Sequence, residues 1–143
     1  MTQLYFENLK IGDQIPPLKK HPTTQQLVMY AGASGDYYQI HYDASFAKEK
    51  GLPGVIVHGA LKNAFLGQLM TDWIGNLGIL LELSVRYRDI DIPNDILTCK
   101  GLVKEISHQG GESKVICDIW IENGSGNITT TGSATISLPM TGG

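Results

Sequence analysis

Strict alternation of apolar and polar residues marks the second half of the chain as strands. From Leu81 to Arg88 every second residue is apolar, and a period of two is typical of a half-buried strand. The same pattern recurs in residues 96–106, 115–121 and 128–138, with turn-forming residues between the runs. It predicts four strands joined as an antiparallel meander. The predicted core face holds Leu97, Cys99, Val103, Val115, Cys117, Ile119, Ile121, Ile128, Thr130, Ala134, Ile136 and Leu138.

Helical signals dominate the first half. Thr23 or Thr24 can cap a helix through residues 25–30, which the following glycines end. Asp43 can cap a second, short helix that stops at Gly51.

The segment from Gly59 to Trp73 is apolar on nearly every side, which is typical of a buried helix. Its small residues recur at helical spacing, so a sheet backbone can approach it closely. One long buried helix followed by four strands predicts an α+β fold, in which an antiparallel β-sheet wraps around a long central helix. The small residues are Ala60, Ala64, Gly67 and Thr71.

Composition narrows the classes of function. The net charge of −3 comes without a basic run, which argues against nucleic acid as the partner. The first residues lack a signal peptide, and no apolar run approaches the roughly 18 residues of a membrane span, so we expect a cytoplasmic protein without a membrane partner. Cys99 and Cys117 lie at apolar strand positions, and we expect both to be reduced core residues.

The length of 143 residues fits one domain, which we place at residues 1–137. Residues 138–143 read LPMTGG and are similar to a sortase recognition motif. A wall-anchoring signal also needs an apolar segment and a basic tail after that motif. We interpret these six residues as a tail, which is either a chance match or an engineered tag.

The candidate chemistry lies in the loop of residues 34–42, between the two predicted helices. Loops on a rigid scaffold commonly carry catalytic groups. Asp36 and His41 are five residues apart and can converge if the loop curls, so that one group accepts a proton from water while the other holds it. The spacing alone leaves a second interpretation open, in which Asp36 caps a turn and His41 is structural.

Gly59 is a second candidate, at the start of the central helix. The first N–H groups of a helix lack partners within it and carry the positive end of its dipole. A glycine there allows a substrate carbonyl to approach, as in an oxyanion hole. The alternative is that Gly59 only permits a tight turn into the helix.

Three segments resemble one known family. The stretch SGDYYQIHYDASFA (residues 34–47) resembles the signature S-G-D-x-N-P-I-H-x-D-x-x-x-A of the MaoC-like dehydratase and (R)-specific enoyl-CoA hydratase family. GVIVHGALKNAFLGQLM (residues 54–70) is similar to that family's loop and central helix. VRYRDIDIPNDILTCKG (residues 85–101) is similar to a third family segment. The resemblance covers roughly residues 25–105 well.

The resemblance implies a hot-dog fold and a hydro-lyase. Asp36 and His41 match the family's catalytic pair, and Gly59 matches the glycine whose amide polarises the thioester carbonyl. Water would add reversibly and syn across a trans-2-enoyl thioester of coenzyme A or an acyl carrier protein, giving a (3R)-hydroxyacyl thioester in fatty acid metabolism. The resemblance implies no metal and no cofactor, and a homodimer. Beside the matched residues, we expect Tyr38, Ile40, Val57 and His58 to bind the substrate.

Several residues depart from the pattern or lie outside it. Tyr38-Gln39 replaces the family's Asn-Pro, so Tyr38 either narrows the pocket or covers the loop from outside. For His58, a packing role competes with one in the site. We interpret His21 and His108 as ordinary surface or turn residues. The remaining pair, Arg86 and Arg88, forms either a solvated face or a contact for phosphates or an acidic carrier.

Two other functions compete with the hydratase. A hot-dog thioesterase usually has a carboxylate on or just before its central helix, but residues 59–71 contain no Asp or Glu. A non-catalytic acyl-binding partner subunit would typically lack the Asp/His pair. The pair therefore favours attack at the β-carbon.

Overall fold

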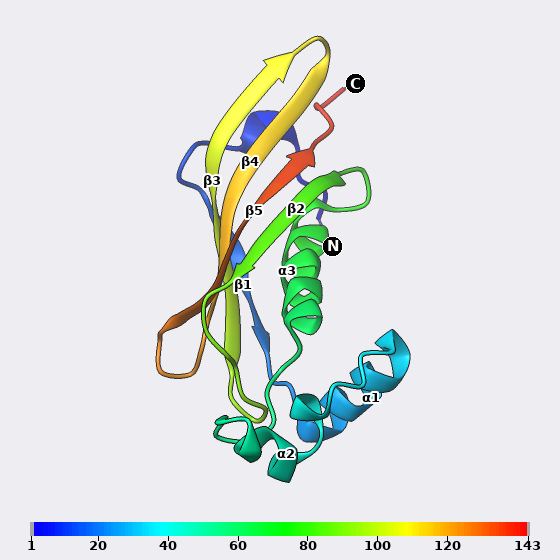
Figure 1. Cartoon of the computed structure of the whole chain (residues 1–143). Helices are drawn as coiled ribbons and strands as arrows, with labels where there is room; N and C mark the ends of the chain where they lie inside the picture. Colours follow the sequence, from blue (N-terminus) through cyan, green and yellow to red (C-terminus); the bar gives the residue numbers. More distant parts are fainter. Residues whose placement is uncertain (1, 143) are drawn as a thin grey trace.

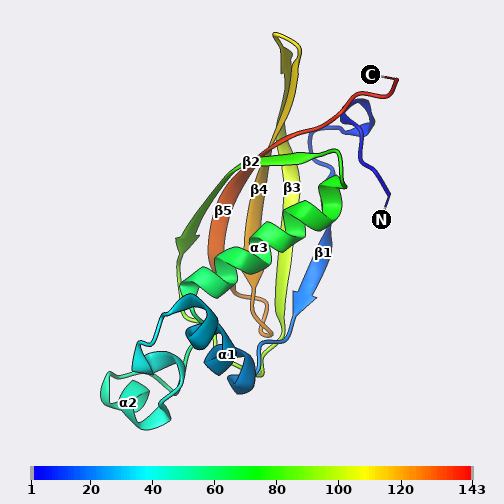
Figure 2. The same cartoon turned by 90° about the vertical axis from the view of Figure 1, so that its right-hand side faces the viewer.

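The computed structural model describes residues 2–142 and contains one antiparallel sheet of five strands in the order β1-β3-β4-β5-β2. Figure 1 shows α3 lying along one face of this sheet, and Figure 2 shows the strands curving behind it. This arrangement confirms the predicted α+β hot-dog fold. The strands are β1 (Gln14–Lys20), β2 (Ile79–Tyr87), β3 (Leu97–Gln109), β4 (Glu112–Glu122) and β5 (Ile128–Ser137).

The helices form where the caps predict them. The Thr23 side chain accepts a hydrogen bond from the Gln26 N–H, and Gly35 ends the helix in the left-handed conformation at φ 77°. Asp43 caps the short helix through the Phe46 N–H at 3.1 Å. The helices are α1 (Thr24–Ser34), α2 (Ala44–Glu49) and α3 (Gly59–Ile74), with 3-10 turns η1 (Phe6–Asn8) and η2 (Gln39–His41).

The core lies between α3 and the concave face of the sheet. Most of the predicted inward positions of β3, β4 and β5 are buried there, together with the apolar face of α3. Cys99 and Cys117 are free and fully buried, as predicted, and burial raises the pKa of each thiol to about 12.

Two predictions about the strands are wrong. The chain has a fifth strand, β1, which the alternation did not indicate because it carries Pro16 and Pro17. This strand lies at the edge of the sheet, where proline is tolerated because no strand on the outer side needs its N–H. The four predicted strands also do not form one simple meander. β3, β4 and β5 do, but β2 pairs with β5 rather than with β3, so the connection after Tyr87 crosses the sheet.

The side-chain pattern of β5 also differs from the prediction. Ile128, placed on the core face by the alternation, is 51% exposed, whereas Thr129 from the opposite set is buried. Thr129 turns inward because its hydroxyl donates a 2.6 Å hydrogen bond to the buried carboxylate of Asp91. From Thr130 to Leu138 the predicted inward positions are buried.

The central helix is buried on one face only, which corrects the prediction of burial all round. Ala60, Ala64 and Thr71, the predicted contact stripe for a sheet backbone, are exposed in the isolated chain. Gly67 of that set does come close to a strand, because a Cβ there would lie 3.7 Å from Leu83 of β2.

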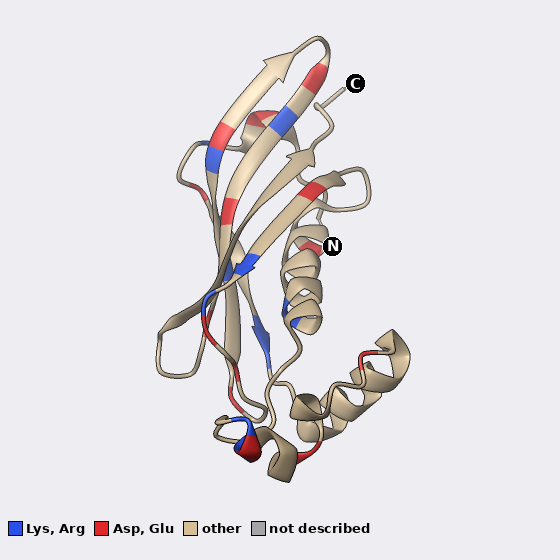
Figure 3. Ribbon diagram, viewed as in Figure 1, with Lys and Arg blue, Asp and Glu red and all other residues tan. Residues whose placement is uncertain are grey.

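Acidic and basic residues are scattered over β2, β3 and β4, β5 carries none, and the ribbon of α3 is largely uncharged (Figure 3). Within residues 2–142 no helix is both long and apolar enough to cross a membrane. Leu138 is buried against the core, and the Pro139 carbonyl accepts a 3.0 Å hydrogen bond from Phe6 N–H. The division into a domain of residues 1–137 and a tail stays a prediction.

Candidate functional site

The loop between α1 and α2 brings Asp36 and His41 together. Gly35 reverses the chain at the end of α1, and η2 places His41 one turn before α2. Asp36 also accepts a long 3.4 Å hydrogen bond from the Tyr38 N–H, so it partly serves the turn-capping role that the sequence left open. In both views the helices of this region lie at the end of the molecule where α3 begins (Figures 1 and 2).

His41 is held in a defined orientation. Its Nδ1 lies 2.9 Å from the Ile56 carbonyl oxygen, which can only accept a hydrogen bond, so Nδ1 carries a proton. In the neutral ring the lone pair is then on Nε2, which lies 3.7 Å from Asp36 Oδ2. That separation is too long for a direct hydrogen bond, but one water molecule can contact both atoms at about 2.8 Å. The pair is thus arranged to bind and activate water.

His58 stacks against His41. The two imidazole rings are 3.8 Å apart and 19° from parallel, and the Tyr30 ring meets His58 edge-on at 4.9 Å. His58 has 0% exposed surface, and neither ring nitrogen has a hydrogen-bond partner among residues 2–142. Burial lowers the pKa of His58, the positive charge of His41 lowers it further, and the Asp36 carboxylate opposes both. The ring is therefore neutral at physiological pH.

The amino-terminal end of α3 leaves backbone N–H groups free. His58 precedes the helix without a side-chain cap, and the first helical bond runs from Lys62 N–H to the His58 carbonyl at 3.1 Å. Gly59 N–H has no acceptor within the described chain. A Cβ at Gly59 would lie 2.9 Å from the ring of Tyr87, so that ring covers the glycine on one side. The helix end can therefore donate to an anionic oxygen.

The geometry does not favour a metal ion at this position. One ligand atom each from Asp36, His41 and His58 lies within 4.8 Å of the others. The two imidazoles are stacked, however, so their in-plane lone pairs run roughly parallel instead of converging on one point. The prediction of no metal stays a prediction.

Of the residues expected to bind substrate, two lie beside the pair. The Tyr38 ring meets His41 edge-on at 6.4 Å and Phe46 at 5.9 Å, with about half of its surface exposed. The His58 ring stacks against His41 at 3.8 Å. Val57 is different because its side chain is buried in the core, whereas Ile40 contributes a backbone carbonyl that accepts from Ile56 N–H at 3.0 Å.

The remaining candidates lie elsewhere. Arg88 donates to the Thr131 hydroxyl at 3.1 Å, and Arg86 is in register with the same threonine, so both arginines lie on the opposite side of β2 from Tyr87 and α3. His21 contacts the Asn94 carbonyl at 3.2 Å, and His108 contacts the Ser113 hydroxyl at 2.8 Å.

Sequence reasoning missed the charged residues behind the helix start. Lys62 is 2% exposed and lies 3.0 Å from the buried carboxylate of Asp91. The available signal was a lone lysine in an otherwise apolar helical segment. Two tyrosines beside the site were missed as well: Tyr87, whose ring covers Gly59, and Tyr30, whose ring contacts His58. We call these two rings the aromatic wall. Burial raises the pKa of Tyr87, and the nearby Tyr30 raises that pKa further. Both tyrosines fall outside the quoted catalytic signature.

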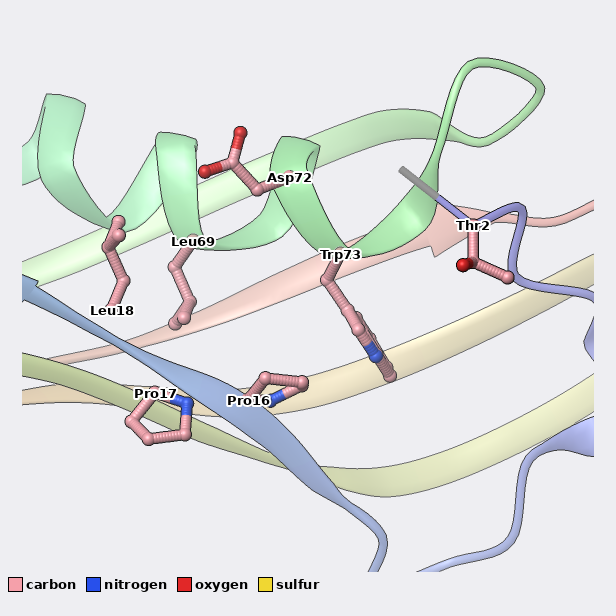
Figure 4. A pocket seen from close by; sticks show the side chains of 7 residues that line it. All are labelled: Thr2, Pro16, Pro17, Leu18, Leu69, Asp72 and Trp73. Atoms are coloured by element: carbon pink, nitrogen blue, oxygen red, sulfur yellow. The ribbon is translucent and has the colours of Figure 1, made fainter.

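A separate cavity lies at the other end of α3. Its volume is about 320 Å³, and it is lined by Leu69, Asp72 and Trp73 of the helix, by Pro16, Pro17 and Leu18 of β1, and by Thr2. Figure 4 shows the side chains of Leu69 and Trp73 pointing from α3 toward β1. Trp73 follows Gly59 by 14 positions in α3, which corresponds to roughly 20 Å along a helix. This cavity is therefore not part of the Asp36–His41 site.

Comparisons with known proteins agree with this fold. The (R)-hydratase from A. caviae involved in PHA biosynthesis is 25% identical, with a TM-score of 0.83 over 93% of this chain and 99% of that chain. A chain of the ChsH1-ChsH2 complex from Mycobacterium tuberculosis is 20% identical, with a TM-score of 0.81 over 90% of this chain and 98% of that chain. The latter supports the fold alone.

A curated relative matches over a shorter stretch. The fatty acid synthase beta subunit TOXC of Cochliobolus carbonum is 36% identical over 73 residues, or 50% of this chain. The match spans only 4% of the length of that relative.

The sheet wrapped around α3 defines a hot-dog fold. The model of the MaoC-like domain family matches residues 8–119, and the chain belongs to that family.

Proposed function

We propose that this chain is an (R)-specific hydratase of trans-2-enoyl thioesters, and a dehydratase of (3R)-hydroxyacyl thioesters in the reverse direction. The observation that carries the proposal is the 3.7 Å approach of His41 Nε2 to Asp36 Oδ2, with Nδ1 fixed by the Ile56 carbonyl. Membership of the MaoC-like family and the (R)-hydratase relative support the same reaction class.

The reaction would use one water molecule held between the pair. Asp36 orients the water, and His41 Nε2 accepts its proton while the oxygen bonds to the β-carbon. The electron pair of the double bond moves onto the thioester oxygen, where the free Gly59 N–H stabilises the negative charge. The imidazolium then returns the proton to the α-carbon on the same face, which completes a syn addition without any cofactor.

Tyr38 and His58 would shape the substrate pocket. Both rings contact His41, and Tyr38 occupies the position of the family's asparagine. We infer that the Tyr38 ring limits the space beside the β-carbon. The acyl group would enter as a thioester of coenzyme A or an acyl carrier protein.

The test distinguishes hydration from the rival thioesterase reaction. Purified protein is mixed with trans-2-butenoyl-CoA and trans-2-octenoyl-CoA, and the enoyl absorbance, free thiol and product chirality are measured. The proposal expects loss of absorbance, a (3R) product and no thiol release. Thiol release from an intact enoyl group would support a thioesterase. Binding of both thioesters without turnover would support the third possibility, a non-catalytic acyl-binding subunit.

We also infer that two copies assemble through β2 and α3. The edge strand β2 exposes Ile79 and Leu81, and the stripe containing Ala60 and Ala64 is open beside it. An uncovered strand edge of this kind pairs readily with a second chain. The solved ChsH1-ChsH2 complex contains two different proteins, so a different partner is the alternative to a second copy.

A further inference from the structure

A buried ion pair lies directly behind the start of α3. Lys62 Nζ donates to Asp91 Oδ2 at 3.0 Å and to the Asp89 carbonyl at 3.1 Å. The same Asp91 oxygen accepts from the Thr129 hydroxyl at 2.6 Å. The three residues of this cluster, Lys62, Asp91 and Thr129, are each exposed by 2% or less.

Stability alone does not explain this cluster. Removing two charges from water costs several kcal/mol per ion, and replacing a buried pair by apolar residues is often neutral or stabilising. The other six buried residues of α3 are apolar, so an apolar residue would fit the pattern at position 62. One carboxylate oxygen, Asp91 Oδ1, even lacks a partner within the described residues.

The cluster connects three segments around the first turn of α3. Lys62 lies in the first turn of α3, Asp91 in the connection after β2, and Thr129 at the start of β5. The Asp91 carbonyl also accepts a 2.8 Å hydrogen bond from Val57 N–H, two residues before Gly59. Asp91 therefore fixes the chain on both sides of the glycine: through its carbonyl before it and through Lys62 after it.

The same contacts orient the aromatic wall. Lys62 Nζ lies 5.5 Å from the centre of the Tyr87 ring, the ring that covers Gly59. Thr129 holds the next residues in place, because its carbonyl accepts from Arg88 N–H at 2.8 Å and from Asp89 N–H at 3.0 Å. Asp91 compensates the charge of Lys62, so the effect on Gly59 is one of geometry rather than of net charge.

We propose that Lys62 and Asp91 are positioning residues that aim the Gly59 amide at the thioester oxygen, which rests on the function proposed above. An oxyanion donor acts mainly in the transition state, so misdirecting it lowers kcat and leaves KM nearly unchanged. A cluster that only stabilised the fold would instead change the unfolding temperature without changing the kcat of the folded protein.

The decisive variant neutralises both partners at constant shape. Lys62→Met/Asp91→Asn keeps the net charge and nearly the volume, and avoids leaving one buried charge alone. We expect at least about a 10-fold fall in kcat, as for loss of part of an oxyanion hole, with KM within about 3-fold of the wild type. The control, Lys100→Met/Glu122→Gln, removes an ion pair of 2.9 Å on the outer face of the sheet and should leave both constants unchanged.

A folded double variant with wild-type kcat would overturn the inference. If the double variant does not fold, Thr129→Val tests the positioning role in its place, because this substitution removes only the hydrogen bond from the Thr129 hydroxyl to Asp91. A kcat reduced several-fold at unchanged KM supports positioning, and an unchanged kcat rejects it.

A second measurement separates this inference from the proposed function. In protein labelled with ¹⁵N-glycine, the Gly59 amide signal is the one missing from Gly59→Ala. It should shift in Lys62→Met/Asp91→Asn and stay in place in the control. If the wild type is inactive on enoyl thioesters, the proposed function fails while the shift still tests positioning. An unmoved Gly59 signal contradicts the positioning role even in an active enzyme.

Discussion

The stack of His41 on His58 places two titratable rings in van der Waals contact in a buried environment. Burial lowers the pKa of His58 and keeps that ring neutral. His41, with Nδ1 bound to the Ile56 carbonyl, directs Nε2 toward Asp36. The sequence indicated the pair of Asp36 and His41 by its signature, but nothing in it indicated that the two histidines stack, because their contact depends on the Ile56 carbonyl holding the ring.

We predict that His58 makes the protein sensitive to acid. Below pH 6.5, the ordinary pKa of histidine, the unfolded chain takes up a proton that the folded ring does not. The free energy of unfolding therefore falls as the pH drops from 6.5 to the lowered pKa of the folded state. His58→Phe keeps an aromatic ring but cannot titrate. Urea unfolding should therefore show that its free energy of unfolding falls less between pH 7.5 and pH 5.5 than that of the wild type. His21→Asn, at an exposed site, serves as the control, and an equal loss in His58→Phe would refute the prediction.

A methyl group at Gly59 tests the approach to the helix start. In Gly59→Ala the new Cβ meets the Tyr87 ring, which is 52% exposed and can swing away, so the unfolding free energy should change by less than about 1 kcal/mol. The catalytic efficiency, kcat/KM, should fall by about 10-fold or more, because the methyl group blocks the thioester oxygen. Wild-type kinetics in this variant would exclude Gly59 as the oxyanion donor.

At the scale of elements, helix caps and the alternation of apolar and polar residues predicted those helices and strands whose position depends on the local sequence. Thr23, Asp43 and the run 115–121 occupy the predicted positions, because each signal acts within one element. β1 escaped prediction since its prolines are tolerated through its place at the sheet edge and the break in its pairing with β3 between Ile15 and Leu18. The burial of Thr129 was equally hidden, because it depends on a carboxylate 38 residues away in the sequence.

Close contact between β2 and β5 requires a glycine in β5. A Cβ at Gly132 would collide with the Ser84 carbonyl oxygen, a backbone atom that cannot move without disturbing the pairing of the two strands. Gly132→Ala should therefore lower the free energy of unfolding by more than about 1 kcal/mol in urea titrations. Gly32→Ala, in α1, where the added Cβ would make only an ordinary contact of 3.9 Å with the Tyr37 hydroxyl, should be neutral or stabilising by up to about 1 kcal/mol. Similar effects of the two substitutions would contradict this packing.

At the scale of the whole molecule, the open face of α3 and the free edge of β2 are the largest departure from the sequence-based expectation. The apolar residues on nearly every side of α3 predicted that the whole helix would be buried. In a single chain, however, only one face of α3 is buried. A second copy would explain both the apolar stripe and the exposed Leu81, which is 48% accessible in the single chain.

The assembly is testable by mass. Light scattering should give twice the chain mass of 15.6 kDa for the wild type. Leu81→Lys, which places a charge on the exposed edge strand, should lower that mass toward the monomer. A wild type that is monomeric at all accessible concentrations would contradict the homodimer.

The central claim is that Asp36 and His41 together add water to an enoyl thioester. The most direct measurement is the rate of loss of trans-2-butenoyl-CoA absorbance with the wild type, Asp36→Asn and His41→Ala, each first shown to be folded. The account predicts rapid hydration by the wild type and a fall of at least about 100-fold in each variant, as expected for removal of a general acid–base group. Hydration that continues at the wild-type rate in both variants would place the active site elsewhere.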